Sequence, residues 1–110
     1  MPDQIVLTYW AIKSLGAPAR MALHYAGVPF KDDVLLDQDK WFSAHKDEVR
    51  RTNPLVNLPH LTLDDGEVVV QSDAVLRHIA RTYGMYGQGE AEMARVDQVM
   101  DVVVDVRQAY

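Results

Sequence analysis

The chain has no cysteine among its 110 residues. This absence excludes disulfides, Cys-x-x-Cys redox chemistry, cysteine nucleophiles and metal sites built from thiolates. The 4 histidines are scattered and show no metal-binding spacing such as His-Glu-x-x-His. We therefore expect no metal ion, and no thiol-disulfide exchange by residues of the chain itself.

A surplus of basic residues is also lacking. The 11 lysines and arginines are outnumbered by 16 aspartates and glutamates, the net charge is −5, and the basic residues form no dense patch. Nucleic acid and anionic membrane surfaces are therefore poor candidates for main partners. No apolar stretch approaches the length of a membrane span, and the first residues include an aspartate where a secretory signal is basic. We expect a cytoplasmic protein.

The first part of the chain alternates between the patterns of strands and helices. Residues 4–10 are short, β-branched and apolar, which is typical of a buried strand. Residues 16–27 switch to helical spacing, with Pro18 near the first turn and Gly27 at the stop. Residues 29–36 predict a second strand. A β-α-β order favours a parallel pair joined by a right-handed crossover.

The pattern then changes to an irregular helix followed by a hairpin. Residues 37–51 are polar and predict a short, irregular helix. His60–Leu63 and Glu67–Val70 flank Asp-Asp-Gly, which predicts a tight hairpin. Ser72 is a good N-cap for a helix that Gly84 ends. The first 84 residues therefore predict βαβ followed by ββα.

The last part of the chain predicts a helix that needs partners on two sides. A glycine-rich connector precedes it, and the helix runs from Glu90 to Tyr110, where the chain stops without a cap. A helix with two apolar sides is normally packed between neighbours. We expect residues 1–84 to be one domain, and residues 85–110 to be a linker and the first helix of a second, helical domain absent from this chain. The apolar sides consist of Met93, Val96, Met100, Val103 and Val104, and of Val99, Val102 and Val106.

Three stretches carry a family resemblance: YWAIKSLGAPARMALHYAGVPF from Tyr9, NLPHLTLDDGEVVVQSDAVLRHIAR from Asn57, and RVDQVMD from Arg95. Together they resemble the N-terminal domain of cytosolic glutathione transferases, most closely the mu class and the related sigma class. The resemblance implies an α/β, thioredoxin-like domain with a mixed four-stranded sheet, followed by the first helix of an all-α domain. It also implies a homodimeric enzyme that conjugates glutathione, a co-substrate, to small electrophilic apolar compounds in detoxification, without a cofactor.

The resemblance makes Tyr9 the catalytic residue, with Trp10 and Leu15 lining the glutathione site. The Tyr9 hydroxyl would donate a hydrogen bond to the glutathione thiolate. A free thiol has a pKa of about 8.5, and lowering it by about two units requires about 2.7 kcal/mol. One hydrogen bond to a charged group supplies about 1.5–3 kcal/mol. Without the resemblance, Tyr9 reads as an ordinary core tyrosine at a strand end.

Two further segments are implied to bind glutathione, mainly through the backbone. Pro59 resembles the cis-proline of thioredoxin-like folds, which would expose the N–H and C=O groups of Leu58 to the cysteinyl unit. The alternative is a trans proline in an edge strand. Gln71 and Ser72 would hold the γ-glutamyl carboxylate at a helix N-terminus, where free N–H groups and the dipole favour an anion. Ser72 could instead serve only as a cap.

The residues implied to bind the glycyl end of glutathione match the family less completely. The resemblance implies that Trp41 contacts it, together with a lysine four residues further on. His45 stands at that place and Lys46 directly follows, so the sequence leaves both open. Asn57 is either part of the site wall or a turn residue.

An acidic stripe recurs every four residues on the last helix, at Asp97, Asp101 and Asp105. Such a stripe is ordinarily a solvated face. By resemblance, an aspartate here approaches the glutathione amino group in the partner subunit. Asp105 matches the mu-class position and Asp101 the sigma-class position.

Two alternative functions share this fold. One is a non-catalytic scaffold, which has no need of Tyr9, Gln71 and Ser72. The other is a sigma-type glutathione-dependent isomerase, which needs the same residues as a transferase. Because the chain lacks the helical domain, we expect it to bind glutathione weakly and to turn over poorly by itself.

Overall fold

The structure, a computed structural model, describes residues 4–109 and contains a mixed four-stranded sheet in the order β2-β1-β3-β4. The strands are β1 (Ile5–Trp10), β2 (Phe30–Leu35), β3 (His60–Thr62) and β4 (Val68–Val70). β1 and β2 run parallel, whereas β3 runs antiparallel to both β1 and β4. The predicted parallel pair, the hairpin and the mixed sheet are confirmed.

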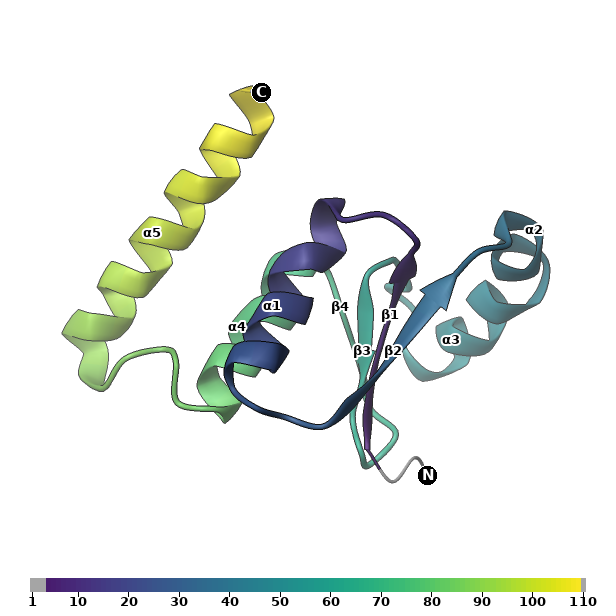
Figure 1. Cartoon of the computed structure of the whole chain (residues 1–110), viewed down its shortest axis with the longest axis horizontal. Coiled ribbons are helices and arrows are strands. Elements are labelled where there is room, and N and C mark those ends of the chain that lie inside the picture. Colours follow the sequence, from purple (N-terminus) through teal and green to yellow (C-terminus); the bar gives the residue numbers. More distant parts are fainter. Residues whose placement is uncertain (1–3, 110) are drawn as a thin grey trace.

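Two helices cover one face of the sheet and form the core with it (Figure 1). A 3-10 turn, η1 (Ser14–Gly16), leads into α1 (Ala17–Tyr25), and α1 packs beside α4 (Ser72–Thr82). Apolar side chains at helical spacing on α1 and α4 meet alternate residues of the strands, which is the arrangement expected of a half-covered sheet. The buried core consists of Leu7, Ala19, Leu23, Leu61, Val75 and Ile79.

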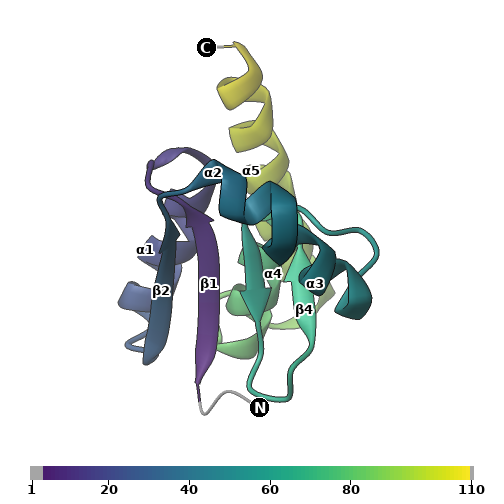
Figure 2. The same ribbon diagram turned by 90° about the vertical axis from the view of Figure 1, so that its right-hand side faces the viewer.

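The irregular helix crosses the opposite face of the sheet, as Figure 2 shows. It consists of α2 (Gln38–Lys40), a π-helical turn η2 (Trp41–His45) and α3 (Lys46–Thr52). The side chain of Asp37 caps its start by accepting hydrogen bonds from two backbone N–H groups of α2. The π-helical turn is the source of the predicted irregularity.

The last helix, α5 (Gly89–Ala109), extends beyond the rest of the molecule at its C-terminal end (Figures 1 and 2). None of its described residues is buried, and Val99 and Val102 are 64% and 59% exposed. The predicted helix is confirmed up to Ala109, and Tyr110 lies outside the described residues. Within residues 4–109, no helix is both long and apolar enough to cross a membrane.

The predicted N-cap of α4 is wrong by one residue. Gln71 occupies the cap position, and Ser72 is the first helical residue. Gln71 has φ 75° and ψ 123°, so the chain turns one residue earlier than a serine cap requires. The predicted C-terminal end of α4 is correct. Gly84 directly follows the C-cap residue Tyr83 and has φ 75°.

Candidate active site at one end of the sheet

The strand register brings three sequence-predicted residues to one end of the sheet. His60 of β3 stands opposite the residue before Tyr9 in β1, and opposite the residue before Gln71 in β4. Tyr9 is the next residue of β1, Pro59 directly precedes β3 and Gln71 directly follows β4, so all three adjoin these pairs at the same end of the sheet. Strand pairing therefore brings residues that are far apart in the chain to one end of three neighbouring strands.

Tyr9 is held tightly between the start of α1 and the sheet. Its side chain is 5% exposed, and its ring packs against the backbone of Gly16. A Cβ atom at Gly16 would lie 2.4 Å from Tyr9 Cδ2, closer than any allowed contact. On the α1 side, the guanidinium carbon of Arg20 lies 6.0 Å from the centre of the Tyr9 ring.

Arg20 also fixes the loop that follows Tyr9. Its guanidinium donates to the carbonyl oxygens of Ile12 at 3.0 Å and Trp10 at 3.4 Å. A third bond, from Nε to Asp32 Oδ1 at 3.1 Å, ties the helix to β2. Sequence reasoning missed Arg20. The only signal in the sequence was a run of charged residues, Lys31, Asp32 and Asp33, inside a predicted strand.

The turn before β3 contains the predicted cis-proline. The Leu58–Pro59 peptide bond is cis, which confirms that prediction. Asn57 Oδ1 accepts a hydrogen bond from the Leu58 N–H at 2.9 Å, so Asn57 acts here as a turn residue. The contact is exposed to solvent, and a ligand carbonyl oxygen could replace the Asn57 oxygen on the same donor.

The start of α4 offers unused backbone donors. The carbonyl oxygen of Gln71 accepts the first helical hydrogen bond, from Val75 at 2.8 Å. The N–H groups of the first turn, beginning with Ser72, therefore point out of the helix end, where an anion is favoured. Gln71 is exposed, and Ser72 is half-buried.

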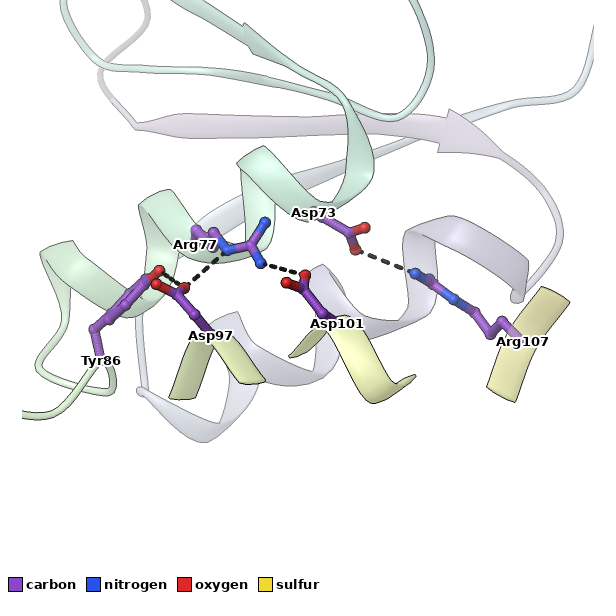
Figure 3. Close-up of polar contacts among 6 residues, drawn as sticks. All are labelled: Asp73, Arg77, Tyr86, Asp97, Asp101 and Arg107. Carbon is purple, nitrogen blue, oxygen red and sulfur yellow. Dashed lines mark hydrogen bonds and ion pairs between the residues drawn. The ribbon is translucent and has the colours of Figure 1, made fainter. Parts of the chain in front are cut away.

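Leu15 and Ser72 line one cavity of about 150 Å³ between η1, α4 and α5. Asp73 also lines it, and its carboxylate opposes an anion at the helix end. Arg107 of α5 donates to Asp73 Oδ1 at 3.2 Å and offsets that charge (Figure 3). Sequence reasoning missed Arg107, because a basic residue in the last turn of a helix has an ordinary explanation in the helix dipole.

Trp41, which is predicted to contact the glycyl end, lies in an aromatic cluster with Trp10 and Phe42. The ring of Trp10 lies 6.4 Å from that of Trp41 and 6.3 Å from that of Phe42, measured between centroids. The ammonium nitrogen of Lys46 lies 5.6 Å from the centre of the Phe42 ring, which is a cation–π distance. Lys46 thus contacts the aromatic cluster, whereas His45 lines a cavity that is also lined by Trp41.

The acidic stripe on α5 is not simply a solvated face. Arg77 of α4 donates to Asp97 at 3.3 Å and to Asp101 at 3.0 Å, and the Tyr86 hydroxyl donates to Asp97 (Figure 3). The hydrogen bond to Asp97 raises the pKa of Tyr86. Asp105 is exposed, and among residues 4–109 it forms no hydrogen bond or ion pair with another predicted site residue. The same residues include no metal-binding group of three or more histidines and acids.

Comparisons with known proteins agree with this fold. The sequence model of the glutathione S-transferase N-terminal domain matches residues 16–82. Glutathione S-transferase 1 of Ascaris suum is 38% identical over 102 residues, which cover 93% of this chain and 46% of the relative. The chain spans about half the length of the curated relatives that it matches.

Two solved structures show the same arrangement. The crystal structure of the glutathione S-transferase from Ascaris lumbricoides has a TM-score of 0.80 and 39% identity, covering 93% of this chain and 46% of that one. The structure of prostaglandin synthase D of Nilaparvata lugens has a TM-score of 0.75 and 31% identity, covering 96% of this chain and 50% of that one.

Proposed function

Since the chain belongs to the glutathione S-transferase family through its N-terminal domain, we propose that it binds glutathione and stabilises its thiolate for transfer to an electrophile. The observation that carries this proposal is that the strand register brings Tyr9, Pro59 and Gln71 to one end of three neighbouring strands. A hydroxyl, the backbone of the turn before β3 and a helix start at one end of a sheet can together bind the cysteinyl and γ-glutamyl units of a tripeptide.

In the proposed complex, glutathione lies across this end of the sheet. Its γ-glutamyl carboxylate accepts from N–H groups at the start of α4, beside Gln71 and Ser72. Its cysteinyl unit pairs with the backbone of Leu58 and replaces the Asn57 side chain there. Its glycyl carboxylate lies near Trp41 and Lys46, whose ammonium group already sits at the edge of the aromatic cluster.

The chemical step requires only that the sulfur lose its proton before it attacks. The thiol proton passes to solvent, and the Tyr9 hydroxyl keeps its own proton and donates it in a hydrogen bond to the thiolate. The sulfur then forms a bond to an electrophilic carbon, whose leaving group departs with its bonding electrons. The rigid packing of Tyr9 between Gly16 and Arg20 favours a fixed donor position, which is what electrostatic stabilisation needs.

The remaining parts of the active site are proposed to come from outside residues 1–84. We propose that residues 1–84 form the glutathione-binding domain, and that residues 85–110 are the linker and first helix of a helical domain that helps to wall the electrophile pocket. The exposed valines of α5 support this division. We also propose a homodimer in the cytoplasm, in which Asp105 approaches glutathione bound to the partner subunit.

The thiolate can be observed directly. Its ultraviolet absorbance, measured against pH with saturating glutathione, is expected to show a midpoint below the ordinary value of about 8.5. In Tyr9→Phe the midpoint should rise by about one to two units, because a hydrogen bond worth about 1.5–3 kcal/mol is lost. Tyr25→Phe, on a residue that is 84% exposed, is the matched control. Saturated binding with an ordinary midpoint in the unmodified chain would contradict a catalytic role and favour a scaffold.

A glutathione-dependent isomerase is the second candidate, and the similarity to the prostaglandin synthase structure supports it. An isomerase releases glutathione unchanged, whereas a transferase consumes one thiol for each product. Free thiol measured against product formed therefore separates the two activities. One thiol lost per turnover supports the transferase, and a constant thiol concentration supports the isomerase.

A further inference from the structure

A second cavity, of about 310 Å³, lies on the face of the sheet opposite the core. Its floor is a row of polar side chains across three strands, because Thr8 pairs with Asp33 on one side and with His60 on the other. Its roof comes from η2 and α3, which cross this face in Figure 2 and contribute Trp41 and Glu48. The cavity is thus separated by the sheet from the Gly16 and Arg20 side, where Tyr9 lies.

The floor contains a buried polar atom without a partner. His60 is 5% exposed, and within the described residues its Nδ1 atom has no hydrogen-bond partner. The ring is held against Trp41, with centroids 5.9 Å apart and planes tilted by 31°. Leaving a buried polar atom unpaired costs about 1–3 kcal/mol, so native structures normally supply a partner.

The charges around the cavity are of one sign. Asp33 and Glu48 bring carboxylates, and the lining residues that the structure describes include no lysine or arginine. Burial lowers the pKa of His60 to about 4, although Asp33 pulls it in the opposite direction, so His60 is uncharged at neutral pH. Such a lining repels the glycyl carboxylate of glutathione and attracts a cation.

We propose that this cavity binds a small organic cation, namely an amine or amidine with an apolar body of one ring. The cationic group donates to the Asp33 carboxylate and to His60 Nδ1, which accepts when the imidazole proton is on Nε2. The apolar body packs against Val6, Val49 and the face of Trp41, where an aromatic surface also favours positive charge. The volume is at the lower end of the range for small-molecule sites.

The floor and rim have separate functions in this site. Asp33 is half-buried and accepts from the Thr8 hydroxyl at 3.4 Å, which leaves its other oxygen for the ligand. Glu48 and His45 are exposed and stand at the mouth of the cavity. A cation therefore first meets the charge of Glu48, and its tightest contact is made at the floor.

The test titrates benzylamine, a cation at pH 7, into the full chain, with neutral benzyl alcohol as the matched probe of the same shape. The NMR signals of the His60 imidazole and the Trp41 indole are expected to shift to saturation with benzylamine. Benzyl alcohol should bind at least tenfold more weakly, because it lacks the charge. Equal affinities for the two probes, or shifts confined to Tyr9 and its neighbours, would overturn the proposal.

Variants locate the charge that is responsible. Asp33→Asn should weaken benzylamine binding about tenfold, the ratio expected for a partly buried ion contact. Glu48→Gln at the exposed rim should weaken benzylamine binding about threefold. This variant tests the charge if Asp33→Asn does not fold. Glu67→Gln in the hairpin is the control and should change nothing. Unchanged binding in Glu48→Gln, or displacement of benzylamine by saturating glutathione, would refute a separate cation site.

Discussion

At the scale of single residues, the contact between Gly16 and Tyr9 determines whether a hydroxyl can be held in one place. The glycine backbone touches the ring where a side chain would overlap two of its carbons, at 2.4 Å and 2.9 Å from a built Cβ. Gly16 has φ −83°, so its importance comes from space and not from backbone conformation. A second residue, Arg20, restrains the ring from the helix side.

Gly16→Ala is expected to lower the free energy of unfolding by about 1–3 kcal/mol, the usual cost of overpacking. The added methyl group must push the Tyr9 ring away, so the thiolate midpoint should also rise. Denaturant unfolding of Gly16→Ala in the Tyr9→Ala background is the control, because removal of the ring removes the overlap. The same loss of stability in both backgrounds would show that the methyl group clashes with something else.

The residues that would contact the ligand could be predicted from the sequence. The residues that hold them in position could not. Tyr9, Pro59 and Gln71 stand in stretches that resemble a known family, and the cis bond at Pro59 is implied by that resemblance. Gly16 read only as the start of a helix, because its contact with Tyr9 depends on how α1 packs on β1. Arg20 was missed for the same reason, since its three acceptors lie at the end of β1, in the loop after it and in β2.

At the scale of elements, the junction between β4 and α4 carries backbone strain. Gln71 has a positive φ of 75°, a conformation that costs a non-glycine residue about 1–3 kcal/mol. Sequence reasoning placed the helix start correctly to within one residue, yet it put the cap on Ser72. A strained cap residue without a side-chain cap bond has no signature in local sequence.

Gln71→Gly should raise the free energy of unfolding by about 1 kcal/mol. Relief of the strain, about 1–3 kcal/mol, exceeds the added flexibility of the unfolded chain, about 0.5–1 kcal/mol. Gln98→Gly in the exposed middle of α5 is the matched control and should lower stability by about 1 kcal/mol, since glycine disfavours a helix. The prediction is wrong if both substitutions destabilise the protein in denaturant unfolding.

Arg77 joins α4 to α5 through ion pairs with two aspartates. The sequence did not reveal this link, because the aspartates lie 20 and 24 positions after Arg77 in the chain. Arg77→Gln should increase hydrogen exchange along α5 and lower stability by about 1 kcal/mol, a modest value because the pairs are partly exposed to solvent. The difference should shrink in high salt. Arg51→Gln on exposed α3 controls for loss of one positive charge, and equal exchange rates in the two variants would contradict the link.

At the scale of the whole molecule, the two faces of the sheet differ in chemistry. One face meets α1 and α4 in an apolar core, and the other carries the polar cavity beneath α3. The order of elements could be read from hydrophobic periodicity, which alternates between two and about 3.6 residues. The polar cavity could not, because His60 and Asp33 become neighbours of Thr8 only through strand pairing.

His60 makes the stability of the whole chain depend on pH. Its pKa is lowered from 6.5 to about 4, mainly by burial, in the folded protein, where Asp33, Glu48 and His45 share its cavity. Between these two values the unfolded chain binds more protons than the folded one, so the free energy of unfolding falls as the pH drops from about 6.5 to about 4. The full loss is on the order of 3 kcal/mol.

Denaturant unfolding from pH 7.5 to pH 4.5 checks this in the unmodified chain and in His60→Phe, which keeps an aromatic ring against Trp41. Stability should decline less steeply in His60→Phe, because its ring takes up no proton on unfolding. His24→Phe, at an exposed position on α1, is the matched control and should decline as the unmodified chain does. Parallel curves for all three proteins would mean that His60 gains its proton equally in both states, and hence that the cavity is open to water when the protein is folded.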